Sequence, residues 1–181
     1  MVGHANLTIE KVPYAGERRE IMQVKDYCLP RLGGGYTVDH VSFTLNQGEV
    51  LGIYGLMGAG RTELVESLMG LHAEATGTIV IGEETITRPN VTDQIARGMV
   101  LVPEDRQKDG LVQTMSISDN LLLTSIGHFT RNGMIDRRRC REAVKKTVAD
   151  MQVKVADVRH LITSLSGGNQ QKVVIGKCVM A

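Results

Sequence analysis

The 181-residue sequence has no excess of charge of either sign, no long apolar run and no even set of cysteines. Its 21 basic and 20 acidic residues nearly cancel, so no global basic field favours nucleic acid as a partner. No apolar run is long enough to cross a bilayer, and the opening residues show no signal-peptide pattern. We therefore expect this chain to reach any membrane through another protein.

The three cysteines (Cys28, Cys140 and Cys178) have no spacing typical of a metal site. We interpret them as reduced thiols of a cytosolic protein. The 42% hydrophobic content is ordinary for a globular protein, and the length suits one domain with a sizeable core.

A glycine-rich turn lies between an apolar run at residues 50–54 and the start of a helix. Gly55, Gly58 and Gly60 stand where a phosphate-binding loop needs glycine. Backbone without Cβ atoms can curl so that successive N–H groups point toward an anion. The following helix adds the partial positive charge of its N-terminus.

Two side chains of this loop bear on phosphate chemistry. Thr62 supplies the hydroxyl of the phosphate-loop pattern, but Arg61 stands where the strict pattern has lysine. Arginine keeps the charge and loses the close fit of the compact lysine ammonium at the reacting phosphate. Taken alone, the loop pattern is equally compatible with a glycine-rich turn that binds no phosphate.

Hydrophobic periodicity and turn residues divide the rest of the chain into strands and helices. Strands are predicted over residues 21–29, 41–45, 50–54, 78–81, 85–87 and 100–102. Helices are predicted from the glycine loop to Gly70, from Asn90 to Gly98, over 117–126 with Ser118 as a candidate cap, from Asp136 to Met151, and from near Asn169 to Ala181. The alternation of strand and helix favours a parallel sheet with helices against it.

Residues 165–172, Leu-Ser-Gly-Gly-Asn-Gln-Gln-Lys, form the most specific motif of the sequence. Ser166 and two glycines at a helix N-terminus offer free N–H groups and a hydroxyl to an anion. An ordinary glycine-containing cap would explain Ser166 and one glycine but not the octet. The octet resembles the signature motif of ATP-binding-cassette (ABC) ATPases, and residues 55–62 resemble their Walker A loop, in the family's order.

The resemblance can be narrowed to one branch of that family. Pro-Glu-Asp-Arg at 103–106 and Asp-Gly-Leu at 109–111 follow a predicted strand, where the family has its Q-loop. With residues 58–62 and 169–172, they resemble the ATP-binding subunits of bacterial importers of ribose, galactose, xylose and related sugars. Such subunits carry two cassettes in one polypeptide, and arginine in the loop is typical of the second.

The resemblance covers roughly residues 21–181 and implies an α/β fold, a P-loop NTPase of ABC type. Its mixed sheet would have an antiparallel β edge and a helical subdomain. The implied divisions are a linker or tail at 1–20, a nucleotide-binding core with the antiparallel part at 21–112, a helical subdomain at 113–164, and the signature motif with its helix at 165–181.

In the family, a Walker B strand and a switch histidine follow the signature helix. We therefore expect a fold that is incomplete at the C-terminus, with apolar faces uncovered around residues 50–54 and 100–102. The full-length subunit would be an ATPase that powers carbohydrate import, but this chain alone would hydrolyse no ATP.

The resemblance also implies the binding residues, with ATP and Mg²⁺ as ligands. Nucleotide would be bound by Gly55, Gly58, Ala59, Gly60, Arg61, Thr62 and Glu63, with Thr62 at the metal and Glu104 at the Q-loop position. ATP held by the partner cassette would be contacted by Leu165, Ser166, Gly167, Gly168, Asn169 and Gln170. Glu104 replaces the family's glutamine, and its carboxylate repels phosphate unless Mg²⁺ or Arg106 screens it. Tyr27 and Tyr36 are candidates for stacking adenine.

The expected partners are the first cassette of the same polypeptide and a membrane permease, which residues 104–112 and the helical subdomain would face. A periplasmic sugar-binding protein would act indirectly, and no nucleic acid is expected as a partner. The subunit would be peripheral, on the cytoplasmic face of the inner membrane.

Two alternative functions stay open. One is a soluble ABC ATPase acting on nucleic acid or ribosomes. Only the basic cluster at residues 137–146 supports it. The other is a non-catalytic phosphate-binding module.

Overall fold

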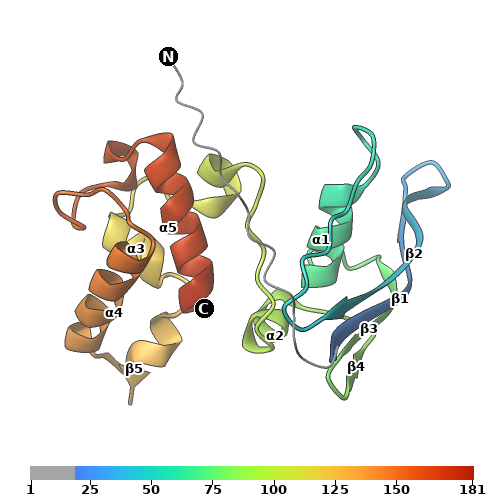
Figure 1. The fold of residues 1–181 in the computed structure, drawn as a ribbon, viewed down its shortest axis with the longest axis horizontal. Helices are drawn as coiled ribbons and strands as arrows, with labels where there is room; N and C mark the ends of the chain where they lie inside the picture. The colour runs from blue at the N-terminus through green and yellow to red at the C-terminus, as the bar shows by residue number, and fades with distance from the viewer. Residues whose placement is uncertain (1–18) are drawn as a thin grey trace.

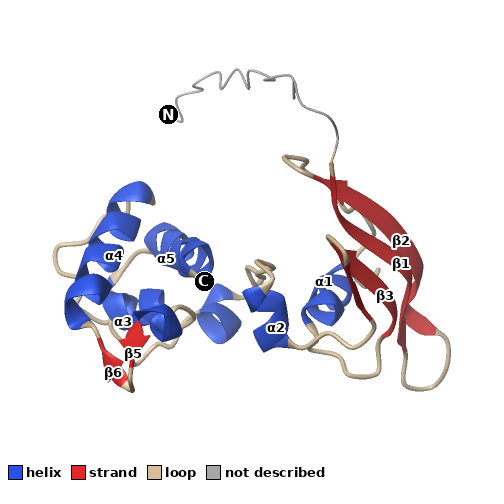
Figure 2. Ribbon diagram, turned by 90° about the horizontal axis from the view of Figure 1, so that it is seen from below, coloured by secondary structure: helices blue, strands red, loops and turns tan. Residues whose placement is uncertain are grey.

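The computed structural model describes residues 19–181, so the predicted linker or tail at 1–20 lies almost wholly outside the described part. Two parts lie side by side, one built on a sheet and one built of helices (Figures 1 and 2). The first part contains β1 (Glu20–Pro30), β2 (Tyr36–Asn46), α1 (Arg61–Met69), β3 (Thr76–Ile81), β4 (Glu84–Ile86) and α2 (Val91–Ala96). The second contains η1 (Arg106–Gly110), α3 (Ile117–Leu122), η2 (Ile126–Phe129), β5 (Thr130–Arg131), β6 (Met134–Ile135), α4 (Arg137–Asp150), η3 (Ile162–Ser164) and α5 (Gly167–Met180).

The sheet of the first part has the strand order β2-β1-β3-β4, and each pair of neighbours is antiparallel. Gln23 of the central strand β1 lies opposite Thr44 of β2 and Val80 of β3. Helix α1 packs on this sheet, because Leu64 and Leu68, four residues apart, share the buried face of the helix. The core between them comprises Val24, Tyr27, Leu29, Val38, Leu64, Leu68, Ile79 and Ile86.

Two buried polar side chains attach α1 to its neighbours. The Tyr27 hydroxyl donates a hydrogen bond to the Ser67 carbonyl over 2.9 Å, and Gln94 Nε2 donates to the Leu68 carbonyl over 2.6 Å. Tyr27 and Gln94 are 1% and 0% exposed, so each bond satisfies a polar group that water does not reach. The end of α1 is therefore held from β1 on one side and from α2 on the other.

The helical part has a separate core beneath α3, α4 and α5. Its members are Leu111, Ile117, Leu121, Leu122, Cys140, Val144, Val153, Ile162, Leu165, Val173 and Val174. Asp136 caps α4 by accepting hydrogen bonds from two backbone N–H groups, those of Arg138 and Arg139, as the sequence predicts for this start.

The predicted hairpin, the α1 end at Gly70 and the Asn90 cap are confirmed, but two helix starts differ. Helix α3 is capped by Ser116, whose Oγ accepts from the Asp119 N–H over 3.0 Å. The predicted cap Ser118 lies inside the helix, and the helix ends at Leu122 rather than 126. Helix α5 begins at Gly167, two residues before the predicted Asn169, because Ser166 is the last residue with extended backbone.

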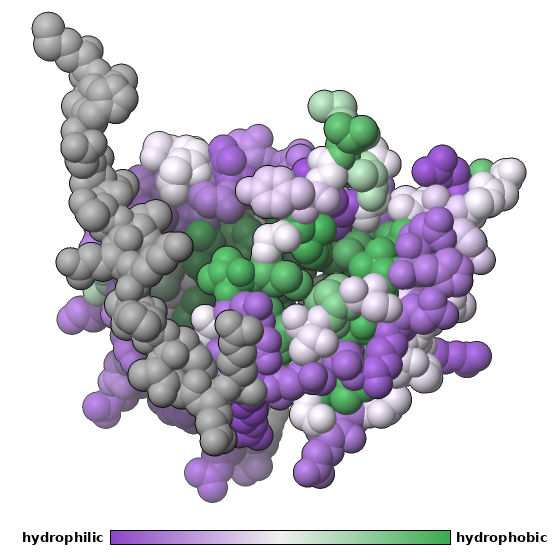
Figure 3. Space-filling view, turned by 45° about the vertical axis from the view of Figure 1, so that its right-hand side comes forward, coloured by the Kyte–Doolittle hydropathy of each residue, from purple (hydrophilic) through white to green (hydrophobic). Residues whose placement is uncertain are grey.

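The predicted strands at 50–54 and 100–102 are wrong: both segments are coil without a strand partner. Within residues 19–181 the sheets are therefore purely antiparallel, and the predicted parallel pairing does not form there. An apolar run becomes a strand only where another strand satisfies its backbone groups. Val50 and Tyr54 are each 96% exposed. This agrees with the expectation that apolar residues around 50–54 are uncovered. Figure 3 shows apolar surface gathered in a hollow between polar side chains.

The segment 101–110 connects the two parts. Lys177 Nζ of α5 donates to the Gly110 carbonyl over 2.6 Å, and the Cys178 thiol lies 3.7 Å from the Leu101 carbonyl. Gly110 is buried, and a Cβ there would lie 3.1 Å from Val174. The segment is thus held along α5.

In residues 19–181 no helix combines the length and apolarity needed to span a membrane.

We predict that Tyr27→Phe lowers the free energy of unfolding by about 1 kcal/mol, because a buried hydrogen bond is lost and the Ser67 carbonyl keeps only the Gly70 N–H as a donor. Urea unfolding measures this. The matched control is Tyr36→Phe, at a ring that is 46% exposed, which should change the free energy by less than about 0.5 kcal/mol.

The size of this difference should depend on pH. Burial raises the pKa of Tyr27 from 10.0 to about 12, so the folded state binds the phenolic proton more tightly than the unfolded state. The resulting stability is present below pH 10 and is lost as the pH rises toward 12. The advantage of the natural protein over Tyr27→Phe should shrink over that range. A difference that is constant with pH would contradict this assignment.

Candidate functional site

The glycine loop lies directly against strand β2. Gly58 and Gly60 have φ angles of 79° and 75°, which L-residues with side chains rarely adopt. Gly60 is buried, and a Cβ on it would overlap the carbonyl oxygen of Thr37. The Gly60 carbonyl accepts from the Leu64 N–H over 2.8 Å and so begins α1. The loop therefore needs glycine at position 60 both for the positive φ and for the close approach to the Thr37 carbonyl.

Arg61 folds back over the loop that precedes it. A Cβ on Gly55 would lie 3.5 Å from Arg61 Cδ and 3.0 Å from the Ala59 Cβ. Gly55, Gly58 and Ala59 are exposed, with their backbone open to a ligand. Glu63 is half-buried on α1 and does not line the adjoining cleft. The loop thus presents its backbone and the Arg61 guanidinium on one side.

An open cleft of about 940 Å³ lies between the start of α1 and the segment 101–109. Arg61 and Thr62 line it from α1, and Glu104 and Arg106 line it from the other side. Thr62 Oγ1 donates to Glu104 Oε2 over 3.4 Å. The structure therefore brings together three residues that the sequence assigned to nucleotide and metal: Arg61, Thr62 and Glu104.

The donors at this point fit Mg²⁺. A hydroxyl oxygen and a carboxylate oxygen, 3.4 Å apart and exposed, are hard ligands of the kind that this ion takes, with water and phosphate completing its shell. Glu104 has no ion pair within the described residues, so its negative charge is available to a cation.

The two tyrosine candidates for adenine have different surroundings. Tyr27 is 1% exposed with its hydroxyl bonded inside the core, so it cannot stack on a ligand, and that candidate is wrong. Tyr36 is 46% exposed at the start of β2, next to Thr37, whose carbonyl lies against Gly60. The remaining candidate therefore lies beside the glycine loop.

The signature residues divide into exposed and buried groups. Ser166 and Gly168 are exposed, and no atom lies within 4 Å of a Cβ built on Gly168. Asn169 donates from Nδ2 to Ser166 Oγ over 3.0 Å and accepts from the Lys154 N–H over 2.9 Å. Asn169 thereby holds the serine hydroxyl at the helix N-terminus, where four backbone N–H groups are free.

Leu165 and Gln170, two of the predicted contacts to ATP, have buried side chains. Leu165 is 9% exposed in the helical core, and Gln170 is 5% exposed beneath the start of α5. Gln170 Nε2 donates to the carbonyls of Ile162 and Leu165. Both side chains therefore support the motif from the interior, Leu165 from just before α5 and Gln170 from its first turn.

Arg106 connects the cleft to the signature motif. Its Nη2 would lie 2.7 Å from a Cβ on Gly167, so the guanidinium occupies space that only glycine leaves free. Its Nε is buried and has no hydrogen-bond acceptor among the described residues. The sequence indicated Arg106 only as a screen for Glu104. Its contact with Gly167 spans sixty-one positions of the chain (167 − 106), and no local pattern predicts it.

The sequence profile of the ABC transporter family matches residues 38–181. The chain belongs to this family. The matched residues include both the glycine loop and the signature motif.

Named relatives fall among sugar importers. The chain is 48% identical over 149 residues to the ribose import ATP-binding protein RbsA of Rhodopirellula baltica, covering 82% of this chain and 29% of that protein. It is 41% identical to the xylose import ATP-binding protein XylG of Pectobacterium atrosepticum, covering 79% and 28%. RbsA of Lactococcus lactis is 38% identical, covering 99% and 35%. The chain thus spans about a third of the length of these relatives.

Solved ABC cassettes share the fold. A nucleotide-free ATP-binding cassette from an ABC transporter has a TM-score of 0.72 at 21% identity, covering 89% of this chain and 65% of that one. A dimeric cassette in a post-hydrolysis state, bound to ADP and phosphate, has a TM-score of 0.71 at 19% identity, covering 88% and 69%. The predicted fold class, a P-loop NTPase of ABC type, is confirmed.

We predict that Gly60→Ala destabilises the chain more than Gly58→Ala does. Both glycines have positive φ, which costs an L-residue about 1 kcal/mol, but only Gly60 also lies against the Thr37 carbonyl. The overlap should add about 1–3 kcal/mol, while a Cβ on Gly58 meets no atom within 4 Å. Urea unfolding of both variants measures the difference. Equal losses would show that the loop moves away from β2 at no cost.

Proposed function

We propose that this chain is the second ATP-binding cassette of a subunit that powers carbohydrate import across a bacterial inner membrane. The observation that carries the proposal is the cleft in which Arg61, Thr62 and Glu104 converge at the start of α1. The names of the ribose and xylose import relatives support the substrate class. In the proposal, the full-length subunit hydrolyses ATP on the cytoplasmic face of the membrane.

The phosphates of ATP would lie over residues 58–62. There the free N–H groups at the start of α1, its helix dipole and the Arg61 guanidinium all favour negative charge. Arginine is a broad fork rather than a compact ammonium, so it binds phosphate oxygens without the close approach of lysine to the reacting group. We infer that this site binds nucleotide better than it hydrolyses it. Tyr36 would stack on the adenine, because it is exposed beside the loop.

Thr62 and Glu104 would hold Mg²⁺. When bound, the ion would neutralise part of the phosphate charge. With that charge neutralised, the Glu104 carboxylate would favour binding of ATP. Without the ion the same carboxylate repels the phosphates.

The exposed Ser166 and Gly168 and the half-buried Gly167 of the signature motif would contact ATP held by the first cassette of the same polypeptide. Support comes from the open N-terminus of α5, where the serine hydroxyl is oriented by Asn169. Arg106 would link the two sites, because it lines the cleft and packs on Gly167. Residues 104–112 and the helical subdomain would face the permease, and a periplasmic sugar-binding protein would act through it.

The basic cluster on α4 gives little support to the alternative of a nucleic-acid or ribosome ATPase. Arg138 pairs with Glu142 at 3.0 Å, and the guanidinium of Arg139 lies over the Phe129 ring at 5.8 Å. Part of the cluster is therefore engaged within the helical part, which agrees with a solvated helix face.

We predict that Arg61→Ala weakens binding of Mg–ATP by about tenfold, the loss of one charge-assisted contact. Arg61→Lys should tighten binding, because lysine restores the close fit. Titration with a fluorescent ATP analogue measures both. Unchanged affinity in both variants would show that residue 61 does not touch phosphate.

We predict that Glu104→Gln has opposite effects with and without magnesium. With Mg²⁺, affinity for ATP should fall several-fold because a ligand of the ion is lost. In EDTA it should rise, because a carboxylate that repels phosphate is gone.

The control for this experiment is Glu83→Gln, on the β3–β4 turn outside the cleft lining, which should change neither affinity. A change of the same sign in both conditions would remove Glu104 from the metal site. Equal binding of ATP and inorganic phosphate would favour the alternative of a simple phosphate-binding module.

A further inference from the structure

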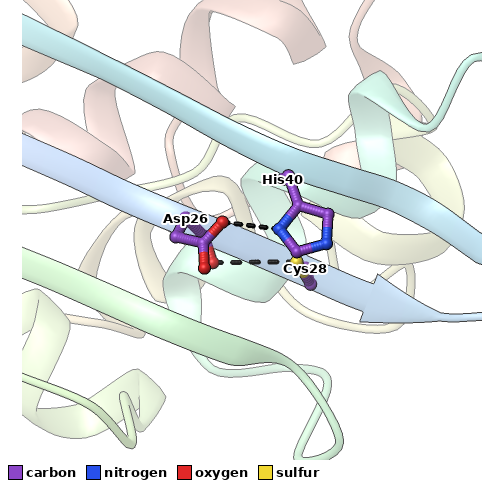
Figure 4. A group of neighbouring side chains, drawn as sticks. All are labelled: Asp26, Cys28 and His40. Atoms are coloured by element: carbon purple, nitrogen blue, oxygen red, sulfur yellow. Dashed lines mark hydrogen bonds and ion pairs between the residues drawn. The ribbon is translucent and has the colours of Figure 1, made fainter.

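Three side chains with metal-binding atoms meet on the β1–β2 hairpin, outside the ATP cleft. Asp26 and Cys28 come from β1 and His40 comes from β2 (Figure 4). One carboxylate oxygen, one thiol sulfur and one ring nitrogen all lie within 4.8 Å of one another. His40 Nδ1 is 2.5 Å from Asp26 Oδ1, and the Cys28 thiol points at the Asp26 carbonyl oxygen 3.7 Å away.

The backbone is irregular at this cluster. Asp26 and His40 have φ angles of 49° and 48°, two of the four non-glycine residues with positive φ in residues 19–181. The pairing of β1 with β2 shifts register between Val24 and Tyr27, and the Asp26 N–H donates a hydrogen bond to the Ser42 hydroxyl over 2.9 Å. Left-handed backbone at residues other than glycine is costly and concentrates at functional sites. Here it turns both side chains toward the same point.

The exposure of the three groups suits an ion that enters from solvent. The Asp26 and His40 side chains are 75% and 57% exposed, while Cys28 is 4% exposed beneath them. The sulfur forms the floor, and the carboxylate and imidazole form the open rim. A fourth position faces water. Three protein ligands with one open position is a common arrangement for Zn²⁺.

We propose that Asp26, Cys28 and His40 form a binding site for a borderline transition-metal ion, Zn²⁺ in the first place. Sulfur and imidazole nitrogen select against Mg²⁺ and Ca²⁺, which take oxygen ligands. The site is separate from the proposed Mg²⁺ position at Thr62 and Glu104 and does not depend on the proposed ATP-binding function.

Binding requires small rearrangements of this hairpin. Zinc bonds of about 2.0–2.3 Å place tetrahedral ligand atoms roughly 3.3–3.7 Å apart, so the exposed Asp26 and His40 side chains must separate from each other and approach the buried sulfur. The Cys28 thiol releases its proton to solvent and binds as the thiolate, and Nδ1 of a neutral His40 donates its lone pair. Because Asp26 and His40 are exposed, their side chains can make these adjustments.

The position of the site gives metal binding a structural consequence. The Tyr36 ring packs edge-to-face on the His40 ring, with centroids 5.4 Å apart and planes at 70°. An ion on Nδ1 fixes the imidazole and restrains this contact. It also ties β1 to β2 at the point where their pairing is irregular.

The cysteine spacing in the sequence gave no metal signal, because only one ligand of this set is a cysteine. The other two are an aspartate two residues earlier and a histidine twelve residues later. They are brought together only by the antiparallel pairing of β1 with β2.

The test is a titration of the full chain with Co²⁺, whose bond to thiolate gives a charge-transfer band in the near ultraviolet. We expect one equivalent to produce the band, and one equivalent of Zn²⁺ to abolish it. Cys28→Ser should lose the band, while Cys140→Ser and Cys178→Ser, which change the other two thiols, should keep it. The circular dichroism of Cys28→Ser shows whether this variant with a buried substitution has folded.

Two exposed substitutions make the test independent of folding. His40→Ala and Asp26→Asn should each weaken Co²⁺ binding by at least about tenfold. Zn²⁺ should raise the melting temperature of the natural chain but not of His40→Ala. Absence of a thiolate band, its persistence in Cys28→Ser, or equal affinity of the natural chain and His40→Ala would each overturn the proposal.

Discussion

The contact of Gly60 with the Thr37 carbonyl is the constraint on which the part built on the sheet depends. It sets the glycine loop against β2, and the Gly60 carbonyl begins α1 in the same turn. The start of α1 then aims its free N–H groups, Arg61 and Thr62 at the cleft. Tyr36, one residue before Thr37, stays exposed beside the loop. One glycine thus places the glycine loop beside the exposed Tyr36 ring.

A second constraint joins the cleft to the helical part. Segment 101–110 lines the cleft with one set of side chains and lies along α5 with another. Glu104 reaches Thr62, while Arg106 reaches Gly167 two residues later in the same segment. One short segment therefore contacts both the glycine-loop side of the cleft and the signature motif.

Much of the local structure could be predicted from the sequence. The antiparallel strands, the end of α1 at Gly70, and the caps Asn90 and Asp136 follow from alternation, glycine and capping chemistry, which act within a few residues. The predictions of strands at 50–54 and 100–102 were wrong because strand formation does not depend on local sequence alone. Their apolar character is local, but strand formation needs a partner strand, and none lies beside them in the described part.

The sequence by itself determined the family and the positions of its two motifs, because glycine, serine and arginine at fixed local spacing make up those motifs. Only the tertiary structure decided which of the candidate residues are exposed to solvent. It placed Tyr27, Leu165 and Gln170 in the interior, and it left Tyr36 and Ser166 at the surface. It also brought Asp26 next to His40, and Arg106 next to Gly167. Burial and long-range contact depend on how strands and helices pack, and no local spacing encodes that packing.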